Sequence, residues 1–188
     1  MNRKVTAYTL TSLDGAVDDP RRYFPATDAM VPGPPVFDAV SEEVEAKTIA
    51  SQDAVLLGRK QYREWVNYWP TSDVQPFADF INSVRKYVIT SKPLTEEWAN
   101  AEAIDEPVEE LVRRLKAEPG RDIGVHGSIT LVQSLLTAGL LDEMVLGVGP
   151  VLDPEGRRLF PDVKEWKRLQ LMDVTSTPSG VIWLTYRL

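Results

Sequence analysis

One stretch of the chain decides its fold: Asp53-Ala54-Val55-Leu56-Leu57-Gly58-Arg59-Lys60. The segment from Ala54 to Leu57 is apolar throughout, which is typical of a strand buried on both faces of a parallel sheet. Gly58 ends this run, and the residues from Arg59 to Tyr68 suit a helix. A buried strand followed at once by a helix is the repeating unit of α/β proteins, so we expect that class here.

The same alternation of strands and helices extends in both directions. Further strands are predicted at residues 4–13, 86–90, 122–125 and 142–148, and further helices at residues 36–49, 77–84, 106–118 and 128–138. Residues 18–35 are rich in proline and predict a loop, and the runs at 169–174 and 181–186 predict a hairpin. We therefore predict a single domain over residues 1–188, with a mainly parallel central sheet, flanking helices and a C-terminal antiparallel hairpin.

The composition excludes several kinds of function. The 188 residues include no cysteine and one histidine, so disulfides and thiolate nucleophiles are excluded and no metal site is expected. The net charge of −7 makes nucleic acid a poor partner. No run approaches the roughly 18 apolar residues of a membrane span, and the first residues lack the pattern of a signal peptide. We therefore expect a cytoplasmic protein with a small-molecule substrate and no membrane partner.

Three predicted turns combine glycine, hydroxyl and basic residues. In parallel sheets ligands bind beyond the carboxyl ends of the strands, and the turns follow three such ends: Gly58-Arg59-Lys60, Thr90-Ser91-Lys92 and His126-Gly127-Ser128. Glycine lets the backbone approach a phosphate, and the N–H groups at a helix start attract anions. Each turn alone also fits an ordinary polar loop, and Ser128 alone fits a helix cap. Together they match the three phosphates of NADP, although neither G-x-G-x-x-G nor the P-loop pattern is present.

A series of motifs runs through nearly the whole chain: Thr11-Ser12-Leu13-Asp14-Gly15, Leu56-Leu57-Gly58-Arg59-Lys60, Tyr68-Trp69-Pro70, Lys86-Tyr87-Val88-Ile89-Thr90-Ser91, Gly127-Ser128, Gly149-Pro150-Val151-Leu152 and Gly156-Arg157-Arg158-Leu159-Phe160. In type and order these motifs resemble the dihydrofolate reductase-like family. They look closest to the branch that contains the reductase domain of riboflavin biosynthesis and its single-domain relatives. The resemblance implies that fold, an NADPH-dependent reductase, and a homodimer that pairs through the C-terminal hairpin.

The resemblance also implies where the cofactor NADPH binds. The adenosine 2′-phosphate would lie against Arg59, Lys60, Thr90, Ser91 and Lys92, beside the close backbone approach at Gly58. The pyrophosphate would meet Gly127, Ser128 and Ile129, with His126 as a further contact. The loop from Asp14 to Val17 would lie beside the nicotinamide, and the substrate would bind between this loop and the helix at residues 36–49. The family often has two glycines where His126-Gly127 stands, so the turn can differ there.

Two carboxylates are candidates for a catalytic acid. In folate reductases a carboxylate on the first helix protonates the substrate, and Glu42 stands at the corresponding distance from Gly58. Glu42 equally fits a solvated acidic face, because it projects opposite the stripe of Phe37, Val40 and Val44. Asp14 could bind the substrate or relay a proton, or it could serve only as the turn-forming residue before Gly15.

The leading hypothesis is an NADPH-dependent oxidoreductase that transfers a hydride to a small heterocyclic substrate of the pterin or aminopyrimidine type. The alternative is a non-catalytic NADP(H)-binding or sensing protein of the same fold, which the lack of an unambiguous catalytic carboxylate favours. A third hypothesis, a nucleotide-binding partner domain, predicts no preference for NADPH over NADH.

Overall fold

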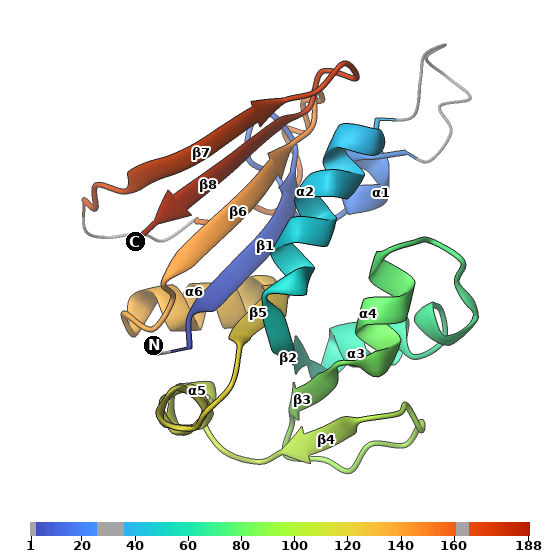
Figure 1. Cartoon of the computed structure of the whole chain (residues 1–188), viewed down its shortest axis with the longest axis vertical. Coiled ribbons are helices and arrows are strands. Elements are labelled where there is room, and N and C mark those ends of the chain that lie inside the picture. The colour runs from blue at the N-terminus through green and yellow to red at the C-terminus, as the bar shows by residue number, and fades with distance from the viewer. Residues whose placement is uncertain (1–2, 26–35, 161–165) are drawn as a thin grey trace.

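A single sheet organises the protein. The computed structural model describes residues 3–25, 36–160 and 166–188, and within these ranges the strands form one eight-stranded sheet of order β4-β3-β2-β5-β1-β6-β8-β7 (Figure 1). Their bounds are β1 Val5–Thr11, β2 Gln52–Gly58, β3 Arg85–Ile89, β4 Ala101–Ile104, β5 Asp122–His126, β6 Glu143–Val148, β7 Gln170–Ser176 and β8 Ile182–Arg187. The six strands from β4 to β6 are parallel, whereas β8 runs antiparallel to β6 and to β7. The predicted parallel sheet with a C-terminal hairpin is confirmed.

Helices cover both faces of this sheet. Their bounds are α1 Pro20–Tyr23, α2 Ala39–Ala50, α3 Arg59–Trp65, the 3-10 turn η1 Trp69–Thr71, α4 Phe77–Ser83, α5 Val108–Ala117 and α6 Ile129–Thr137. Figure 1 shows α2 and α4 in front of the sheet and α6 behind it. The apolar residues of α5 and α6 pack in one core cluster, and those of α3 and α4 pack in another on the opposite face. Among the described residues, no helix has the length and apolar character needed to cross a bilayer.

The strand β2 is buried on both faces, as its sequence predicts. Ala54 and Leu56 belong to the core cluster on the side of α5 and α6, while Val55 and Leu57 belong to the cluster on the side of α3 and α4. Because alternate side chains of a strand point to opposite faces, an unbroken apolar run is needed where helices cover both of them.

Three local features differ from the prediction. The edge strand β4 was not expected, because it has only four residues and Ile104 alone among them is buried. The short helix α1 lies inside the predicted loop, where Pro20 stands at its first turn and Tyr23 is buried. Residues 26–35 of that predicted loop lie outside the described residues.

The face that α2 buries differs in part from the prediction. Phe37 and Val44 of the predicted stripe are partly buried and pack against a core cluster, but the residues that α2 buries most deeply are Ser41, Glu45 and Ile49. The hydroxyl of Ser41 accepts a hydrogen bond of 3.0 Å from Nε1 of Trp183 on β8. This helix therefore packs a face of mixed apolar and polar residues against the sheet.

Candidate functional site

Two of the three predicted turns are joined by direct hydrogen bonds. The N–H of Gly58, at the end of β2, donates to Oγ of Ser128 at 3.0 Å. The same hydroxyl donates to Oε1 of Gln61 at 2.6 Å, and Nε2 of Gln61 donates to the carbonyl oxygen of His126. Since β2 and β5 are parallel neighbours, their carboxyl ends meet at one rim of the sheet. The start of α3 and the start of α6 are thus held side by side.

Arg59 connects the remaining turn to this rim. Its Nη1 lies 3.1 Å from Oγ1 of Thr90, 3.3 Å from the carbonyl oxygen of Lys92 and 3.2 Å from that of Pro93. A cavity of about 250 Å³ lies beside Thr90, between the ends of β3 and β4. Its walls combine apolar, hydroxyl and acidic side chains, namely Ile89, Thr90, Ser91, Ile104, Asp105, Glu106 and Pro107.

The start of α6 has no side-chain cap. Ser128 occupies the N-cap position that the sequence predicts, but its hydroxyl bonds to Gly58 and Gln61 and makes no capping bond. Gly127 has a φ of 72°, a backbone conformation that glycine adopts without strain. The first N–H groups of a helix lack partners within the helix, and an anion can accept from them. The geometry of this rim therefore suits a phosphate group.

Some predicted cofactor residues lie elsewhere. Nζ of Lys60 lies 3.9 Å from a carboxylate oxygen of Glu64, and the Lys60 side chain is 92% exposed along α3. The His126 ring is buried below the rim, where it contacts Phe77 and Phe80, so only its carbonyl group reaches the rim. Val17 is buried in the core on the side of α6. The structure therefore does not bring the side chains of Lys60 and His126 to the predicted phosphate site.

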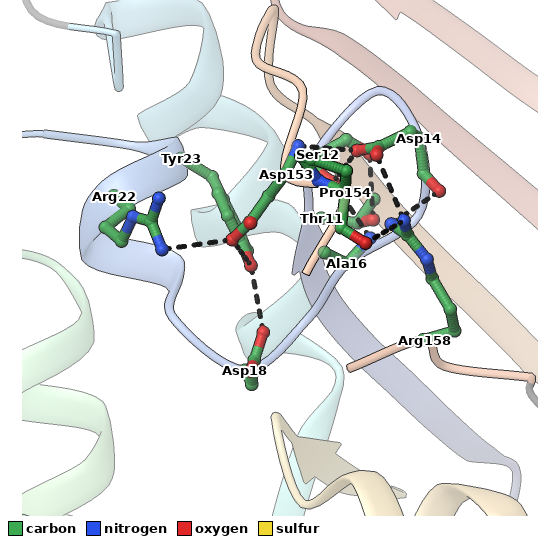
Figure 2. Close-up of polar contacts among 10 residues, drawn as sticks. All are labelled: Thr11, Ser12, Asp14, Ala16, Asp18, Arg22, Tyr23, Asp153, Pro154 and Arg158. Carbon is green, nitrogen blue, oxygen red and sulfur yellow. Dashed lines mark hydrogen bonds and ion pairs between the residues drawn. The ribbon is translucent and has the colours of Figure 1, made fainter. Parts of the chain in front are cut away.

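Hydrogen bonds and an ion pair of Asp14 fix the position of the loop that follows β1 (Figure 2). Its Oδ1 accepts from the Ser12 hydroxyl at 2.6 Å and from the N–H of Asp153 at 2.9 Å, and its Oδ2 pairs with Arg158 at 3.1 Å. Arg158 also donates to the carbonyl oxygen of Asp14 at 2.8 Å. The backbone N–H of Asp153, together with Ser12 and Arg158, holds the pKa of Asp14 well below its usual range. Asp14 is therefore an ionised loop-positioning group rather than a proton source near neutral pH.

A second network of hydrogen bonds and an ion pair, next to Asp14, connects α1 to the same loops (Figure 2). The hydroxyl of Tyr23 lies 3.0 Å from Oδ1 of Asp18 and 3.1 Å from Oδ2 of Asp153, and Arg22 pairs with Asp153 at 3.2 Å. Burial and these two carboxylates raise the pKa of Tyr23. A Cβ at Gly156 would overlap Ala16, and so the loops pack too closely for any other residue there. The loop after β1, the helix α1 and the loop around residues 153–158 are thus joined by hydrogen bonds and ion pairs beside the end of β1.

Glu45 is the acidic residue that the sequence prediction missed. Glu42, the predicted candidate, is exposed in the first turn of α2, whereas Glu45 is only 8% exposed. Oε1 of Glu45 lies 3.4 Å from the hydroxyl of Tyr8 on β1. Burial raises the pKa of Glu45 to about 7, the Tyr8 hydrogen bond opposes this rise, and the charge of Glu42 adds to it. In the sequence, the i, i+4 and i+8 spacing of Ser41, Glu45 and Ile49 indicates that these three residues share one face of the helix.

Around Glu45 lies a cluster of aromatic and polar side chains, which we call the α2-side cluster: Tyr8, Glu45, Gln52, Phe77, Phe80, His126 and Trp183. Tyr8 stacks on Trp183 with 5.4 Å between ring centroids, and its ring lies 5.4 Å from that of His126. Nε2 of His126 lies 2.8 Å from Oε1 of Gln52. Burial lowers the pKa of His126 to about 3, so its ring is neutral. Nδ1 of His126 and Nε2 of Gln52 have no hydrogen-bond partner within the described parts of the chain.

Comparison with known proteins identifies the family. The chain matches the RibD C-terminal domain family over residues 3–183. It is 33% identical to the uncharacterized protein YyaP of Bacillus subtilis over 138 residues, which cover 71% of this chain and 73% of YyaP.

Solved structures share the fold. One is a pyrimidine reductase-like protein from Corynebacterium diphtheriae, with a TM-score of 0.67, 16% identity and coverage of 98% of this chain and 91% of the other. Another is a diaminohydroxyphosphoribosylaminopyrimidine deaminase/5-amino-6-(5-phosphoribosylamino)uracil reductase from Thermotoga maritima, with a TM-score of 0.65, 16% identity and coverage of 99% and 56%. The structural similarities show the fold, while the match over residues 3–183 shows that the chain belongs to the RibD C-terminal domain family.

Proposed function

We propose that this protein is an NADPH-dependent reductase that transfers a hydride from the nicotinamide to a small heterocycle of the pterin or aminopyrimidine type. One observation carries the proposal: the hydroxyl of Ser128 turns to the N–H of Gly58, so α6 begins without a side-chain cap at the same rim as Arg59. Two structural neighbours are named as a pyrimidine reductase-like protein and as a deaminase/reductase, which supports the same chemistry.

The rim offers a distinct place for each part of the cofactor. Gly127, Ser128 and Ile129 form the start of α6 and would hold the pyrophosphate. Arg59, Thr90, Ser91 and Lys92 would hold the adenosine 2′-phosphate. The adenine suits the cavity of about 250 Å³, because Ile89, Ile104 and Pro107 give it apolar walls. The carboxylate of Asp105 in that cavity would repel a phosphate and keep it on the side of Arg59, whereas the carboxylate of Glu106 is paired with Arg114 at 2.6 Å.

The other end of the rim would hold the nicotinamide, which supplies the hydride when the cofactor is bound. The loop from Ser12 to Val17 borders this end, and its ion pair between Asp14 and Arg158 fixes its position. The substrate would bind on the α2 side, where Glu45 replaces Glu42 and Asp14 as the candidate proton donor. Its pKa of about 7 keeps a large fraction of Glu45 protonated at neutral pH.

The non-catalytic alternative also has an observation in its favour. The two acids predicted from the sequence lie in different settings, since Asp14 is ion-paired with Arg158 and Glu42 is exposed, and neither contacts the α2-side cluster through a hydrogen bond in the described residues. A protein that only binds NADP(H) would need the rim but no proton donor. Steady-state oxidation of NADPH in the presence of pterins, aminopyrimidines and quinones separates the two functions, because a binder would show no turnover with any of them.

Calorimetry tests the cofactor site. We expect the unmodified chain to bind NADPH at least about tenfold tighter than NADH, a difference of about 1.4 kcal/mol. Arg59→Ala should remove most of this preference, whereas Lys60→Ala should keep it, because Lys60 lies along α3 beside Glu64. If folded protein takes up neither coenzyme, the proposed function is wrong.

We further propose that the protein forms a homodimer through β7 and β8. Leu171, Val174 and Ile182 are 50%, 56% and 41% exposed, which is unusual for neighbouring apolar residues on one sheet. Within the described residues β7 is the outermost strand, and two copies of one edge can pair about a twofold axis. Light scattering should give a dimer mass for the unmodified chain and a monomer mass for Val174→Glu. A monomeric unmodified chain at micromolar concentration would rule out this interface.

A further inference from the structure

The amide group of Gln61 has a forced orientation at the rim. Gln61 lies on α3, and its Nε2 donates to the carbonyl oxygen of His126, the last residue of β5. A carbonyl oxygen can only accept, so the NH2 group of the amide has to face it. The amide oxygen Oε1 therefore faces Ser128, and it accepts the hydroxyl proton of Ser128 at 2.6 Å. Gln61 thus fixes the direction in which the Ser128 hydroxyl points.

This direction leads away from the start of α6. A serine at the N-cap position usually accepts a hydrogen bond from the second or third N–H of its helix. The Oγ of Ser128 instead accepts from the N–H of Gly58 at 3.0 Å, and it makes no capping bond in the described structure. A Cβ at Gly58 would lie 3.2 Å from this oxygen, so β2 approaches Ser128 closely. Gln61 and Gly58 together hold the hydroxyl, and the first N–H groups of α6 stay available as donors.

A second, independent feature near the start of α6 is the hydroxyl of Thr9 on β1. Thr9 is 3% exposed, and its Oγ1 has no hydrogen-bond partner among the described residues. Val5 and Ala7 belong to the core cluster on the side of α6, so alternation along the strand places Thr9 on that side. Its neighbour Tyr8 accepts a hydrogen bond of 3.1 Å from the N–H of Gly127, just before α6. Because buried polar atoms rarely lack partners, a ligand at the start of α6 would supply the one that is missing.

We propose that Gln61 is a positioning residue for coenzyme binding, because it holds the Ser128 hydroxyl away from α6 and so keeps the helix start open for the pyrophosphate. This proposal rests on the proposed function and names a residue that determines the affinity for both nicotinamide coenzymes. If the hydroxyl were released, it could turn and cap α6, and it would then compete with a phosphate for the same N–H groups. Gln61 has this effect without touching the coenzyme.

Gln61 and Arg59 act on different parts of the coenzyme. The pyrophosphate is common to NADPH and NADH, whereas only NADPH carries the 2′-phosphate. A substitution at Gln61 should therefore weaken the binding of both coenzymes by the same factor, while a substitution at Arg59 should remove the preference between them. This contrast distinguishes positioning of the helix start from binding of the 2′-phosphate.

Calorimetry with NADPH and with NADH on the full chain tests the proposal. Gln61→Met keeps the length of the side chain but removes the amide, and it should weaken the binding of both coenzymes about five- to tenfold while the ratio of their affinities stays the same. Gly58→Ala should weaken both about two- to fivefold, because its Cβ would displace the Ser128 oxygen. Gln75→Met, the same substitution at an exposed site, should leave both affinities unchanged.

A double substitution shows whether Gln61 acts through Ser128. In the Ser128→Ala background no hydroxyl can cap α6, so Gln61→Met should weaken coenzyme binding by less than about twofold there. A loss that came only from disturbed packing around Gln61 would persist in this background.

Each other outcome overturns the proposal. If Gln61→Met binds NADPH as tightly as the unmodified chain, or if its loss persists in the Ser128→Ala background, Gln61 does not keep the helix start open. If the affinities for NADPH and NADH fall by different factors, Gln61 acts on the 2′-phosphate instead. Gly58→Ala remains decisive if Gln61→Met does not fold, because it displaces the same hydroxyl. Failure of the proposed function has a different sign, since the unmodified chain would then bind neither coenzyme.

Discussion

Glu45 should make the stability of this protein depend on pH in a direction that is uncommon for a carboxylate. Its pKa is about 7 in the folded protein against an ordinary value of 4.5, so the folded state holds this proton more tightly than the unfolded state. The stability from this group is therefore fully present below pH 4.5, is lost as the pH rises toward 7, and stays lost above that. The difference between the two pKa values corresponds to about 3 kcal/mol in total.

Glu45→Gln removes this ionisation and keeps the size of the side chain and an oxygen that can accept from Tyr8. Between pH 5 and pH 8 the unmodified protein should lose about 2.5 kcal/mol of stability through Glu45, and the variant should not. For a chain of this size, that corresponds to about 5–10 °C in the difference between the two melting temperatures. His126 acts in the opposite direction, because its lowered pKa costs stability as the pH falls below 6.5. That contribution is the same in both proteins and cancels in the comparison.

The measurement is urea unfolding followed by circular dichroism at pH 5, 6, 7 and 8, with Glu43→Gln as the control for an exposed acid on the same helix. The stability of Glu45→Gln relative to the unmodified protein should rise steadily across this series, while that of the control stays flat. Parallel pH curves for Glu45→Gln and the unmodified protein would show that Glu45 is not a buried acid with a raised pKa.

Three further predictions concern stability. Lys86→Met should lower the free energy of unfolding by about 2–4 kcal/mol, because the carbonyl groups of Ile81 and Val84 lose their buried donor; urea unfolding measures this, and Lys47→Met, on the exposed side of α2, should cost far less. Gly156→Ala should cost about 1–3 kcal/mol, since its Cβ would overlap Ala16 and approach Asp153 and Tyr23; an unchanged unfolding midpoint would contradict the packing described. Asp14→Asn should lower the melting temperature at pH 7, because the folded-state pKa of Asp14 is lowered. Its effect should begin to fade only below the ordinary carboxyl pKa and should disappear as the pH falls toward the lowered pKa of Asp14, and an effect that grows on acidification would be inconsistent with the ion pair to Arg158.

The features predicted correctly from the sequence depend on strong local patterns. The apolar run at Ala54–Leu57 required burial on both faces, and the structure buries these residues in two clusters. The prediction of the three turns at one rim followed from the geometry of parallel strands, and the hydrogen bonds from Gly58 to Ser128 and from Arg59 to Thr90 show that they meet. To predict these features, one needs only the direction of the strands and the positions where the apolar runs end.

The features that escaped prediction depend on tertiary contacts. Apolar periodicity places Val40 and Val44 at the buried side of α2, and Val44 does pack against the core, yet Ser41 and Glu45, one position further in each turn, are buried more deeply. On that side Tyr8 and Trp183 donate hydrogen bonds to Glu45 and Ser41, so these polar side chains can be buried there. The sequence did not predict that the ring of His126 points inward, for a related reason. In a sheet that is covered on both faces, alternation does not distinguish an inside from an outside.

The proposed positions of NADPH and of the substrate meet at β5. His126 is its last residue and turns its ring to the side of α4, while the next two residues, Gly127 and Ser128, open the rim at the start of α6. A change at the rim should therefore leave the α2 side intact. Arg59 and Glu45 share no hydrogen-bond or ion-pair partner in the described structure, so the double variant Arg59→Ala/Glu45→Gln should show additive losses. Calorimetry with NADPH and with 6-hydroxymethylpterin measures each loss separately. A coupling above about 0.5 kcal/mol between the two substitutions would mean that the rim and the α2-side cluster respond as one unit, and their independence would then be wrong.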